Sequence, residues 1–204
     1  RPELTDCPLS TVSPMTYPAG DGTSIPGYLT LPPGHTSARG LPAIVMPHGG
    51  PSARDEWGFD WLAQYFANQG YAVLQPNFRG SAGYGEGWLM TNGFVSWRTA
   101  IGDIDDAGRW LIAQGADAGK LSIVGWSYGG YAALQSGVTE PGLFKAIVAI
   151  APVTDLPQMR GELNRYYYRR DIVAGPGRGP RNIAGDPAPP PRHRAGPGPV
   201  LHGA

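Results

Sequence analysis

Cysteine is nearly absent from this 204-residue sequence, and so are long apolar runs and any excess of charge. The single cysteine, Cys7, excludes an internal disulfide and a cysteine-based metal site, which suits a reducing compartment. No apolar run approaches the roughly 18 residues that a membrane-spanning helix needs. The formal net charge is zero, and no basic stripe is present to contact phosphates. These absences predict a cytoplasmic protein that binds neither nucleic acid nor membrane.

The N-terminal end lacks both an initiating methionine and the apolar stretch of a signal peptide, as its first four residues, Arg1 to Leu4, illustrate. We therefore expect residues 1–11 to be the remnant of a leader or linker. With 41% hydrophobic residues, the rest is long enough to form one sizeable core.

The C-terminal end has a different composition, since fifteen of the thirty residues from 175 to 204 are glycine or proline. Four arginines against one aspartate give this stretch a charge of about +3. A segment of this kind cannot bury enough apolar surface to hold one conformation, so we expect a disordered tail. A reading-frame slip in a GC-rich gene and an authentic linker are two alternative origins for it.

Short apolar runs alternate with helical patterns between these two ends. The runs predict strands, and they lie at 27–31, 43–46, 71–74, 121–124 and 146–150. Apolar residues at helical spacing predict one helix that ends at Gly70 and a second that ends at Gly115. The Asp21-Gly22 pair predicts a hairpin that would form an antiparallel edge. The pattern therefore predicts an α/β domain over residues 12–174, with a mainly parallel sheet and helices on both faces.

One strand-to-helix junction has the pattern of a nucleophile elbow. The apolar run at 121–124 leads into Gly125-Trp126-Ser127-Tyr128-Gly129-Gly130, and a helix-forming run follows. Such a tight turn lifts a serine hydroxyl clear of the sheet. It needs Gly125 and Gly129 because a Cβ at either position would meet the neighbouring backbone. The sequence therefore predicts Ser127 as a nucleophile, against the alternative of an ordinary exposed serine in a glycine-rich turn.

A second motif follows the strand at 43–46 and has the pattern of an oxyanion loop, Pro47-His48-Gly49-Gly50-Pro51. Acyl transfer requires N–H donors aimed at the oxygen of a tetrahedral intermediate. The candidates are the backbone N–H of Tyr128 and that of Gly49 or Gly50, with His48 organising the loop. The alternative is that Gly-Gly-Pro only turns the chain.

Two further patterns predict neither a cofactor nor a metal. The glycines at 80, 83, 85 and 87 do not have dinucleotide-loop spacing, and no helix pattern begins there. Asp103, Asp105 and Asp106 do not share one helical face, so they are interpreted as a solvated helix start.

Arg79 is expected to pair with Asp103 or Asp106 and brace the floor of the site, with direct substrate contact as the alternative.

These motifs together resemble the catalytic domain of the prolyl oligopeptidase family of serine peptidases, over residues 12–174. The resemblance rests on the 48–51 loop, on Gln75 to Gly85, on Asp103 to Asp106 and on the 125–130 elbow. It implies an α/β-hydrolase fold, an acyl-enzyme at Ser127, short peptides as substrates and an N-terminal β-propeller that is missing from this chain. Some relatives supply a tyrosine hydroxyl to the oxyanion hole from the loop at 48–51; this chain lacks it.

The resemblance also implies a triad aspartate and histidine after the serine, and neither can be placed on a residue of this chain. The chain closes on Pro199 to Ala204, which resembles the start of the strand that precedes the acid. We therefore expect a fold that is incomplete at its C-terminus and a fragment that is inactive, with His193 and His202 as poor candidates for the base. A carboxylesterase and a non-catalytic truncated product remain alternatives.

Substrate-binding residues are expected near the nucleophile. Tyr166 and Tyr167 belong to an aromatic segment, and such segments line the substrate pocket in this family. Together with Arg79 they are the predicted substrate-binding residues, while a lid or surface helix without substrate contact is the alternative for the aromatic pair.

Overall fold

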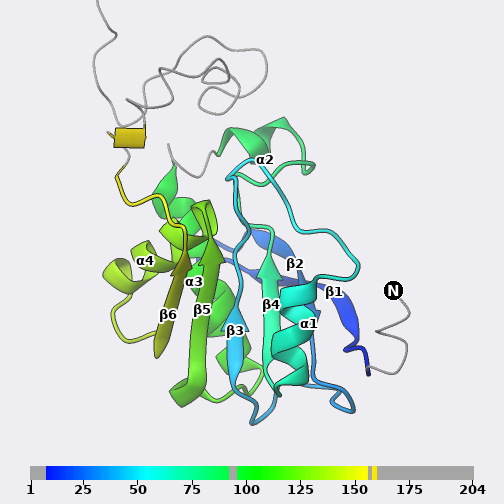
Figure 1. Ribbon diagram of the computed structural model, residues 1–204. Helices are drawn as coiled ribbons and strands as arrows, with labels where there is room; N and C mark the ends of the chain where they lie inside the picture. The colour runs from blue at the N-terminus through cyan, green and yellow to red at the C-terminus, as the bar shows by residue number, and fades with distance from the viewer. Residues whose placement is uncertain (1–7, 92–95, 156–157, 160–204) are drawn as a thin grey trace, which may run out of the picture. The chain divides into compact units, whose positions relative to one another are not determined.

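The computed structural model describes residues 8–91, 96–155 and 158–159 (Figure 1). Every described residue belongs to one compact unit of the chain, Arg1–Tyr167. Six strands form one sheet in the order β1-β2-β4-β3-β5-β6. The strands are β1 (Val12–Pro18), β2 (Ser24–Thr30), β3 (Ala43–Val45), β4 (Ala72–Pro76), β5 (Leu121–Trp126) and β6 (Ala146–Ile150). The helices are α1 (Trp61–Asn68), α2 (Glu86–Met90), α3 (Trp97–Ala113) and α4 (Tyr128–Thr139), with a 3-10 turn at Ala118–Lys120.

The sheet is antiparallel at one side and parallel over the rest. Strands β1 and β2 form the predicted hairpin, with Tyr17 opposite Ile25, and the Asp21 side chain accepts from Thr23 N–H at 3.0 Å in the turn. Strand β2 also pairs antiparallel with β4, whereas β4, β3, β5 and β6 are mutually parallel neighbours. The predicted mainly parallel α/β sheet with an antiparallel edge is therefore confirmed.

Helices cover both faces of the sheet. Helix α1 begins where the Asp60 carboxylate accepts hydrogen bonds from Leu62 and Ala63 N–H, and it packs Ala63 against Met46 and Val124. Helices α3 and α4 pack on the opposite face, where a Cβ built on Gly108 of α3 would lie 3.2 Å from Leu121 Cδ2 of β5 (Figure 1). Strands β3 and β4 are buried throughout, as apolar strands with helices on both sides should be.

The acidic residues of α3 correct one expectation. Helix α3 begins at Trp97, so Asp103, Asp105 and Asp106 lie in its interior rather than at a solvated start. Asp103 and Asp105 are buried, and burial raises the pKa of Asp105 to about 6. Asp106 accepts from Gly20 N–H and forms an ion pair with Arg109. The interpretation of a solvated helix start was therefore wrong, because the three residues lie six or more positions after the first residue of α3 and two of them are buried.

The glycine-rich loop after β4 corrects a second expectation. Helix α2 begins at Glu86, directly after Gly85, where the sequence pattern indicated no helix. The helix is only five residues long and is anchored at its base, since Trp88 accepts from Gly80 N–H through its carbonyl and donates to Phe78 O through its ring. A helix this short has no hydrophobic periodicity, so its tertiary contacts rather than its pattern define it.

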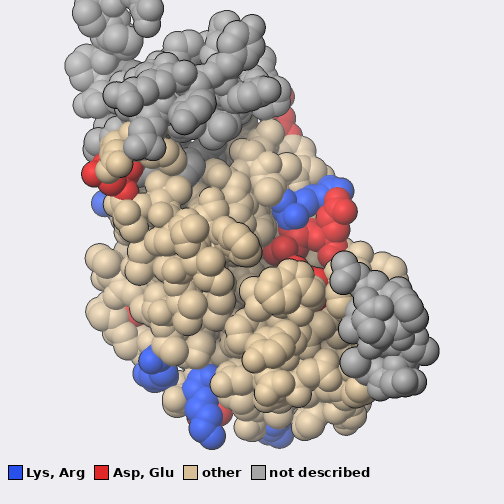
Figure 2. Space-filling model, viewed as in Figure 1, with Lys and Arg blue, Asp and Glu red and all other residues tan. Residues whose placement is uncertain are grey.

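No helix among the described residues is long and apolar enough to cross a bilayer. On the face shown in Figure 2, the Lys and Arg side chains of the described residues lie apart from one another and form no continuous stripe.

Candidate active site

Ser127 lies at the junction of β5 and α4 in the backbone conformation of an elbow. Its φ and ψ are 57° and −117°, a region that non-glycine residues rarely adopt. Holding a residue there costs about 1–3 kcal/mol, and such strain gathers at functional sites. The Ser127 N–H donates to Ile150 O at 2.9 Å and its carbonyl accepts from Tyr131 N–H at 3.0 Å, so the peptide groups before and after Ser127 are both held by hydrogen bonds.

The glycines around Ser127 are needed for close backbone contacts. A Cβ on Gly125 would lie 2.0 Å from Gly129 O, and a Cβ on Gly129 would lie 2.2 Å from Pro47 O. Both distances are far inside van der Waals contact, so the predicted requirement for glycine at these two positions is confirmed. The second contact also shows that the first turn of α4 packs directly on the loop after β3.

The loop at 47–51 lies beside the nucleophile candidate. A Cβ built on Gly49 would be 3.3 Å from Trp126 O and 3.6 Å from the Ser127 Cβ. The two motifs that the sequence separates by more than seventy residues therefore meet. Tyr128 opens α4 with its side chain fully buried, so its backbone N–H belongs to the N-terminal turn of a helix, where the helix dipole favours negative charge.

The ring nitrogens of His48 are hydrogen-bonded to residues other than Ser127. Nδ1 lies 2.6 Å from Gly49 O and Nε2 lies 2.7 Å from the Ser81 hydroxyl oxygen. The His48 ring stacks on Phe78 with centroids 4.4 Å apart. Burial lowers the pKa of His48 to about 4, so the ring is neutral at physiological pH. These contacts agree with the interpretation of His48 as a residue that organises the loop.

Arg79 binds two carboxylates of the fold. Its guanidinium contacts both oxygens of Asp103, with Nη2 to Oδ1 at 2.6 Å and Nε to Oδ2 at 2.9 Å, and Nη1 pairs with Asp21. The Asp103 carboxylate raises the pKa of Arg79 further above its usual range. Of the two partners considered from sequence, Asp103 is the one that Arg79 contacts. All three guanidinium nitrogens are thus hydrogen-bonded to Asp103 or Asp21. A substrate group that contacted Arg79 would have to bind in addition to these two carboxylates or in place of one of them.

The remaining predicted site residues, Tyr166 and Tyr167, lie outside the described residues, as do His193 and His202. The other described histidine, His35, is exposed and lies in the loop before β3, with Nδ1 3.3 Å from Pro33 O. Neither described histidine is therefore in place to take a proton from Ser127.

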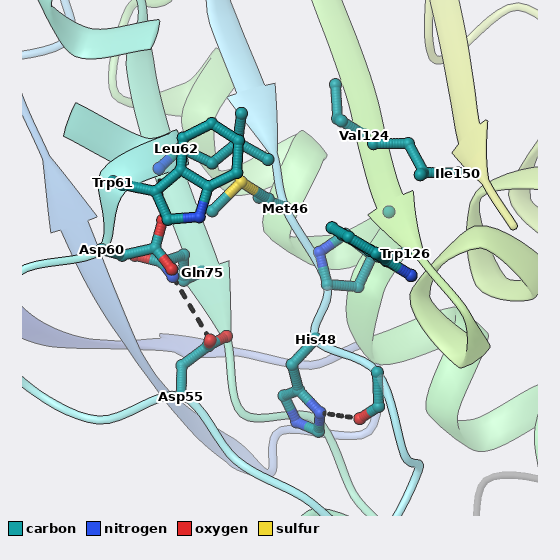
Figure 3. Close-up of a pocket in the computed structure, with 13 residues that line it drawn as sticks. Met46, His48, Asp55, Asp60, Trp61, Leu62, Gln75, Val124, Trp126 and Ile150 are labelled. Carbon is teal, nitrogen blue, oxygen red and sulfur yellow. Dashed lines mark hydrogen bonds between the residues drawn. The ribbon is translucent and has the colours of Figure 1, made fainter. Parts of the chain in front are cut away.

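A cavity of about 200 Å³ opens beside the oxyanion loop (Figure 3). His48 and Trp126 lie on one side of it, and Gly49 also lines it. The other lining residues come from α1, the loop before it and the strand ends: Met46, Pro47, Asp55, Asp60, Trp61, Leu62, Gln75, Val124, Gly125 and Ile150.

Two of the lining residues are carboxylates that the sequence interpretation did not select. Burial first, and then the charge of Asp60, raise the pKa of Asp55 to about 7, although Gln75 donates to Asp55 Oδ1 at 3.3 Å. Asp60 could have been identified as the cap of α1 from its place before a helical pattern. Asp55 carries no such signal, because its burial depends on β4 and on the loop around it.

This chain is similar in sequence to known peptidases. The family model described as "Prolyl oligopeptidase family" matches residues 57–175. Dipeptidyl aminopeptidase BIII from Pseudoxanthomonas mexicana is 36% identical over 176 residues, which cover 82% of this chain and 25% of that protein. Dipeptidyl peptidase family member 6 from Caenorhabditis elegans is 33% identical over 198 residues, covering 85% of this chain and 26% of that protein. The chain thus spans about a quarter of the length of these relatives.

Solved structures give the same result. A puromycin-hydrolyzing peptidase from Mycobacterium tuberculosis aligns with a TM-score of 0.69 and 28% identity, over 79% of this chain and 25% of that one. An acylaminoacyl peptidase from Pyrococcus horikoshii aligns with a TM-score of 0.70 over 85% of this chain and 28% of that one, and at 24% identity it supports the α/β-hydrolase fold alone. With the family match over more than half of its residues, this chain belongs to the prolyl oligopeptidase family of peptidases.

Proposed function

We propose that this chain carries the nucleophile and the oxyanion hole of a serine peptidase that hydrolyses short peptides through an acyl-enzyme at Ser127. The observation that supports it most is the strained elbow, which holds Ser127 at φ 57° beside Gly49. Family membership supports the same reaction class, since relatives of this chain are dipeptidyl peptidases by name.

The chemistry follows from this arrangement. The Ser127 oxygen attacks the peptide carbonyl, and the carbonyl oxygen gains negative charge as the new C–O bond forms. The N–H of Tyr128 and an N–H of the Gly49–Gly50 segment would donate to that oxygen. The C–N bond then breaks as the proton taken from serine passes to the departing amine, and water hydrolyses the resulting ester.

The proposal needs a general base for Ser127. In the described part of the chain, His48 is bonded to Ser81 and Gly49, and His35 lies in the exposed loop before β3. We therefore assign the base, and the aspartate that orients it, to residues outside the described set. Without the histidine, turnover in related mechanisms falls on the order of a millionfold.

Labelling with a fluorophosphonate probe tests the proposal. The 204-residue chain, its Ser127→Ala variant and a longer version of the domain that continues through the aspartate and histidine implied by the family would be compared. Labelling that depends on Ser127 in either version supports the nucleophile assignment. If only the longer version reacts, the base lies in the added residues; if the short chain reacts, His193 and His202 become the residues to replace. Absence of labelling in both versions would refute the proposal.

A carboxylesterase is the second candidate, because its fold and elbow are shared with peptidases and the chemistry must be decided at the site. Peptide amides and aryl esters assayed side by side with whichever version is labelled would separate the two. Hydrolysis of esters alone would favour the esterase.

A further inference from the structure

The buried loop that follows β4 touches both halves of the proposed oxyanion hole. Phe78 and Ser81 in this loop are each fully buried, yet neither belongs to the hydrophobic pattern of a strand or helix. Ser81 contacts His48 of the oxyanion loop. Phe78 lies between two rings, with the His48 ring 4.4 Å away and the Tyr128 ring 5.7 Å away, centroid to centroid. One loop thus contacts the residue before Gly49 and the residue after Ser127.

The hydrogen bonds of His48 determine which ring nitrogen carries the proton. Gly49 O can only accept, so Nδ1, at 2.6 Å, must carry the hydrogen. A neutral ring then has a bare lone pair at Nε2, and the Ser81 hydroxyl at 2.7 Å must be the donor. Ser81 Oγ also donates to Phe78 O at 2.7 Å, so its single hydrogen is shared between this carbonyl and His48 Nε2. The carbonyl has two other donors, the N–H of Ser81 and the ring N–H of Trp88. Donation to His48 therefore leaves no buried carbonyl unsatisfied.

This bond also orients the next peptide group. In a planar trans peptide the C=O of Gly49 and the N–H of Gly50 point in opposite directions. When His48 holds the Gly49 carbonyl, it consequently fixes the direction of the Gly50 N–H on the other side of the peptide. No described residue accepts a hydrogen bond from the Gly50 N–H in the structure. A Cβ built on Gly49 would lie 3.6 Å from the Ser127 Cβ, so the Gly49–Gly50 peptide begins next to the nucleophile candidate.

We propose that Ser81, acting through His48, is a positioning residue that aims the Gly50 N–H at the oxygen of the tetrahedral intermediate formed on Ser127. This rests on the proposed function, and it selects Gly50 over Gly49 as the loop donor. Phe78 supports the same arrangement by setting the spacing between the His48 ring and the Tyr128 ring.

Removal of the hydroxyl makes a specific change. In Ser81→Ala the Nε2 atom loses its donor, so the ring is free to move its proton from Nδ1 to Nε2. Nδ1 would then present a lone pair to the Gly49 carbonyl, and the peptide would be released. Small misplacements of catalytic groups cost up to about a hundredfold in rate. We expect Ser81→Ala to slow the phosphonylation of Ser127 by about ten- to a hundredfold, in whichever version of the domain reacts.

Two controls separate positioning from general damage. Ser10→Ala removes another buried serine hydroxyl, at a residue whose backbone is hydrogen-bonded to Gln64 of α1 rather than to the 47–51 loop, and it should leave the labelling rate unchanged. His48→Asn places an amide near the position of Nδ1, so it can still donate to Gly49 O but presents no Nε2 to Ser81. The effect of Ser81→Ala should therefore vanish in the His48→Asn background. An equal rate loss in both backgrounds would mean that Ser81 acts only on the stability of the loop.

Nuclear magnetic resonance on the unreacted 204-residue chain tests the geometry independently of Ser127 chemistry. We expect a neutral His48 with its proton on Nδ1, and a shift of the Gly50 amide and Gly49 carbonyl signals in Ser81→Ala but not in Ser10→Ala. A Gly50 amide signal that stays in place in Ser81→Ala overturns the proposal. If no version of the domain is labelled, the proposed function fails, while the Gly50 signal still decides whether Ser81 orients this peptide. In the labelled protein, the proposal would also be overturned if the phosphonyl group shifted the amide signal of Gly49 and left that of Gly50 in place.

Discussion

At the scale of single residues, the site depends on backbone approach rather than on long side chains. Gly129 brings the first turn of α4 against Pro47 O, where any Cβ would lie at 2.2 Å. The approach holds the 47–51 loop against the elbow and brings Gly49 next to Ser127. The geometry of the proposed oxyanion hole therefore depends on Gly129 having no Cβ.

Gly129→Ala should destabilise the domain by roughly 2–4 kcal/mol, because neither Pro47 O nor the helix backbone can move away without breaking other contacts. Urea unfolding followed by circular dichroism measures the loss. Gly102→Ala is the matched control: Gly102 lies inside α3 with nothing within 4 Å of its virtual Cβ, so alanine there should stabilise by about 0.5–1 kcal/mol. Equal behaviour of the two variants would contradict the close approach.

Asp55 should give the domain a pH-dependent stability. Burial and the charge of Asp60 raise its pKa from 3.8 to about 7. The folded state therefore binds a proton that the unfolded state releases. The stabilisation that this proton gives the folded state is fully present below about pH 4 and is lost as pH rises through 7. The free energy of unfolding should fall by at most about 4 kcal/mol over this range. Chemical unfolding at pH 5 and pH 8 should show a smaller difference for Asp55→Asn than for the unmodified chain.

The neighbouring carboxylate supplies the control for this pH dependence. Asn caps helices about as well as Asp does, so Asp60→Asn keeps the start of α1 while it removes the charge beside Asp55. Without that charge the pKa of Asp55 is lower, so the variant should lose its stability over a lower range of pH than the unmodified chain. A pH dependence that is the same in Asp55→Asn and in the unmodified chain would show that other groups, such as Asp105 with its pKa of about 6, produce it.

At the scale of elements, the glycine-rich loop after β4 is attached to α3 by one ion pair. Arg79 is 18% exposed and Asp103 is 1% exposed in their side chains, and the backbone N–H of Arg79 also donates to Asp103 Oδ2 at 2.9 Å. The same loop continues into Ser81, which contacts His48. Helix α3 is thereby connected to the proposed oxyanion hole through a short stretch of chain.

Asp103→Asn should destabilise the domain by about 2–4 kcal/mol, since it leaves the Arg79 guanidinium partly buried with one carboxylate instead of two. Asp21→Asn removes the other partner, which is half exposed, and should change the stability little because solvent screens such a pair. Urea midpoints of both variants test the ranking. A larger loss in Asp21→Asn than in Asp103→Asn would show that the exposed pair is the important one.

Sequence patterns predicted these elements well where burial follows a local period. The strands at 43–45, 121–126 and 146–150 and the Asp21-Gly22 hairpin lie where apolar runs and turn residues placed them. The patterns were wrong for Asp103 and Asp105, because the burial of both depends on tertiary packing: Asp103 is paired with Arg79, 24 residues away, and Asp105 is buried although its Oδ1 has no hydrogen-bond partner among the described residues. The hydrogen bond between Ser81 and His48 could not be predicted either, because it joins residues that are 33 positions apart in the sequence.

At the scale of the whole described domain, one face of the sheet retains exposed apolar side chains. Trp126 of β5 and Val148 of β6 alternate with residues that face α3 and α4, so they lie on the α1 side with Val124 and Ile150. They are 57% and 46% exposed. Strand β6 is the last strand of the sheet order among the described residues and carries no charged side chain. An apolar edge of this kind is a template for association with another chain.

We expect the chain to self-associate through this edge as its concentration rises, and Val148→Lys to reduce that association, because a lysine on an edge strand opposes strand pairing. Sedimentation velocity over a concentration series measures the effect. Val138→Lys is the matched control, since Val138 is 75% exposed but lies on helix α4 rather than on a strand. If hydrophobic exposure alone caused association, the more exposed Val138 would give the larger effect. A specific role for the β6 edge requires that Val148→Lys lower the association while Val138→Lys leaves it unchanged.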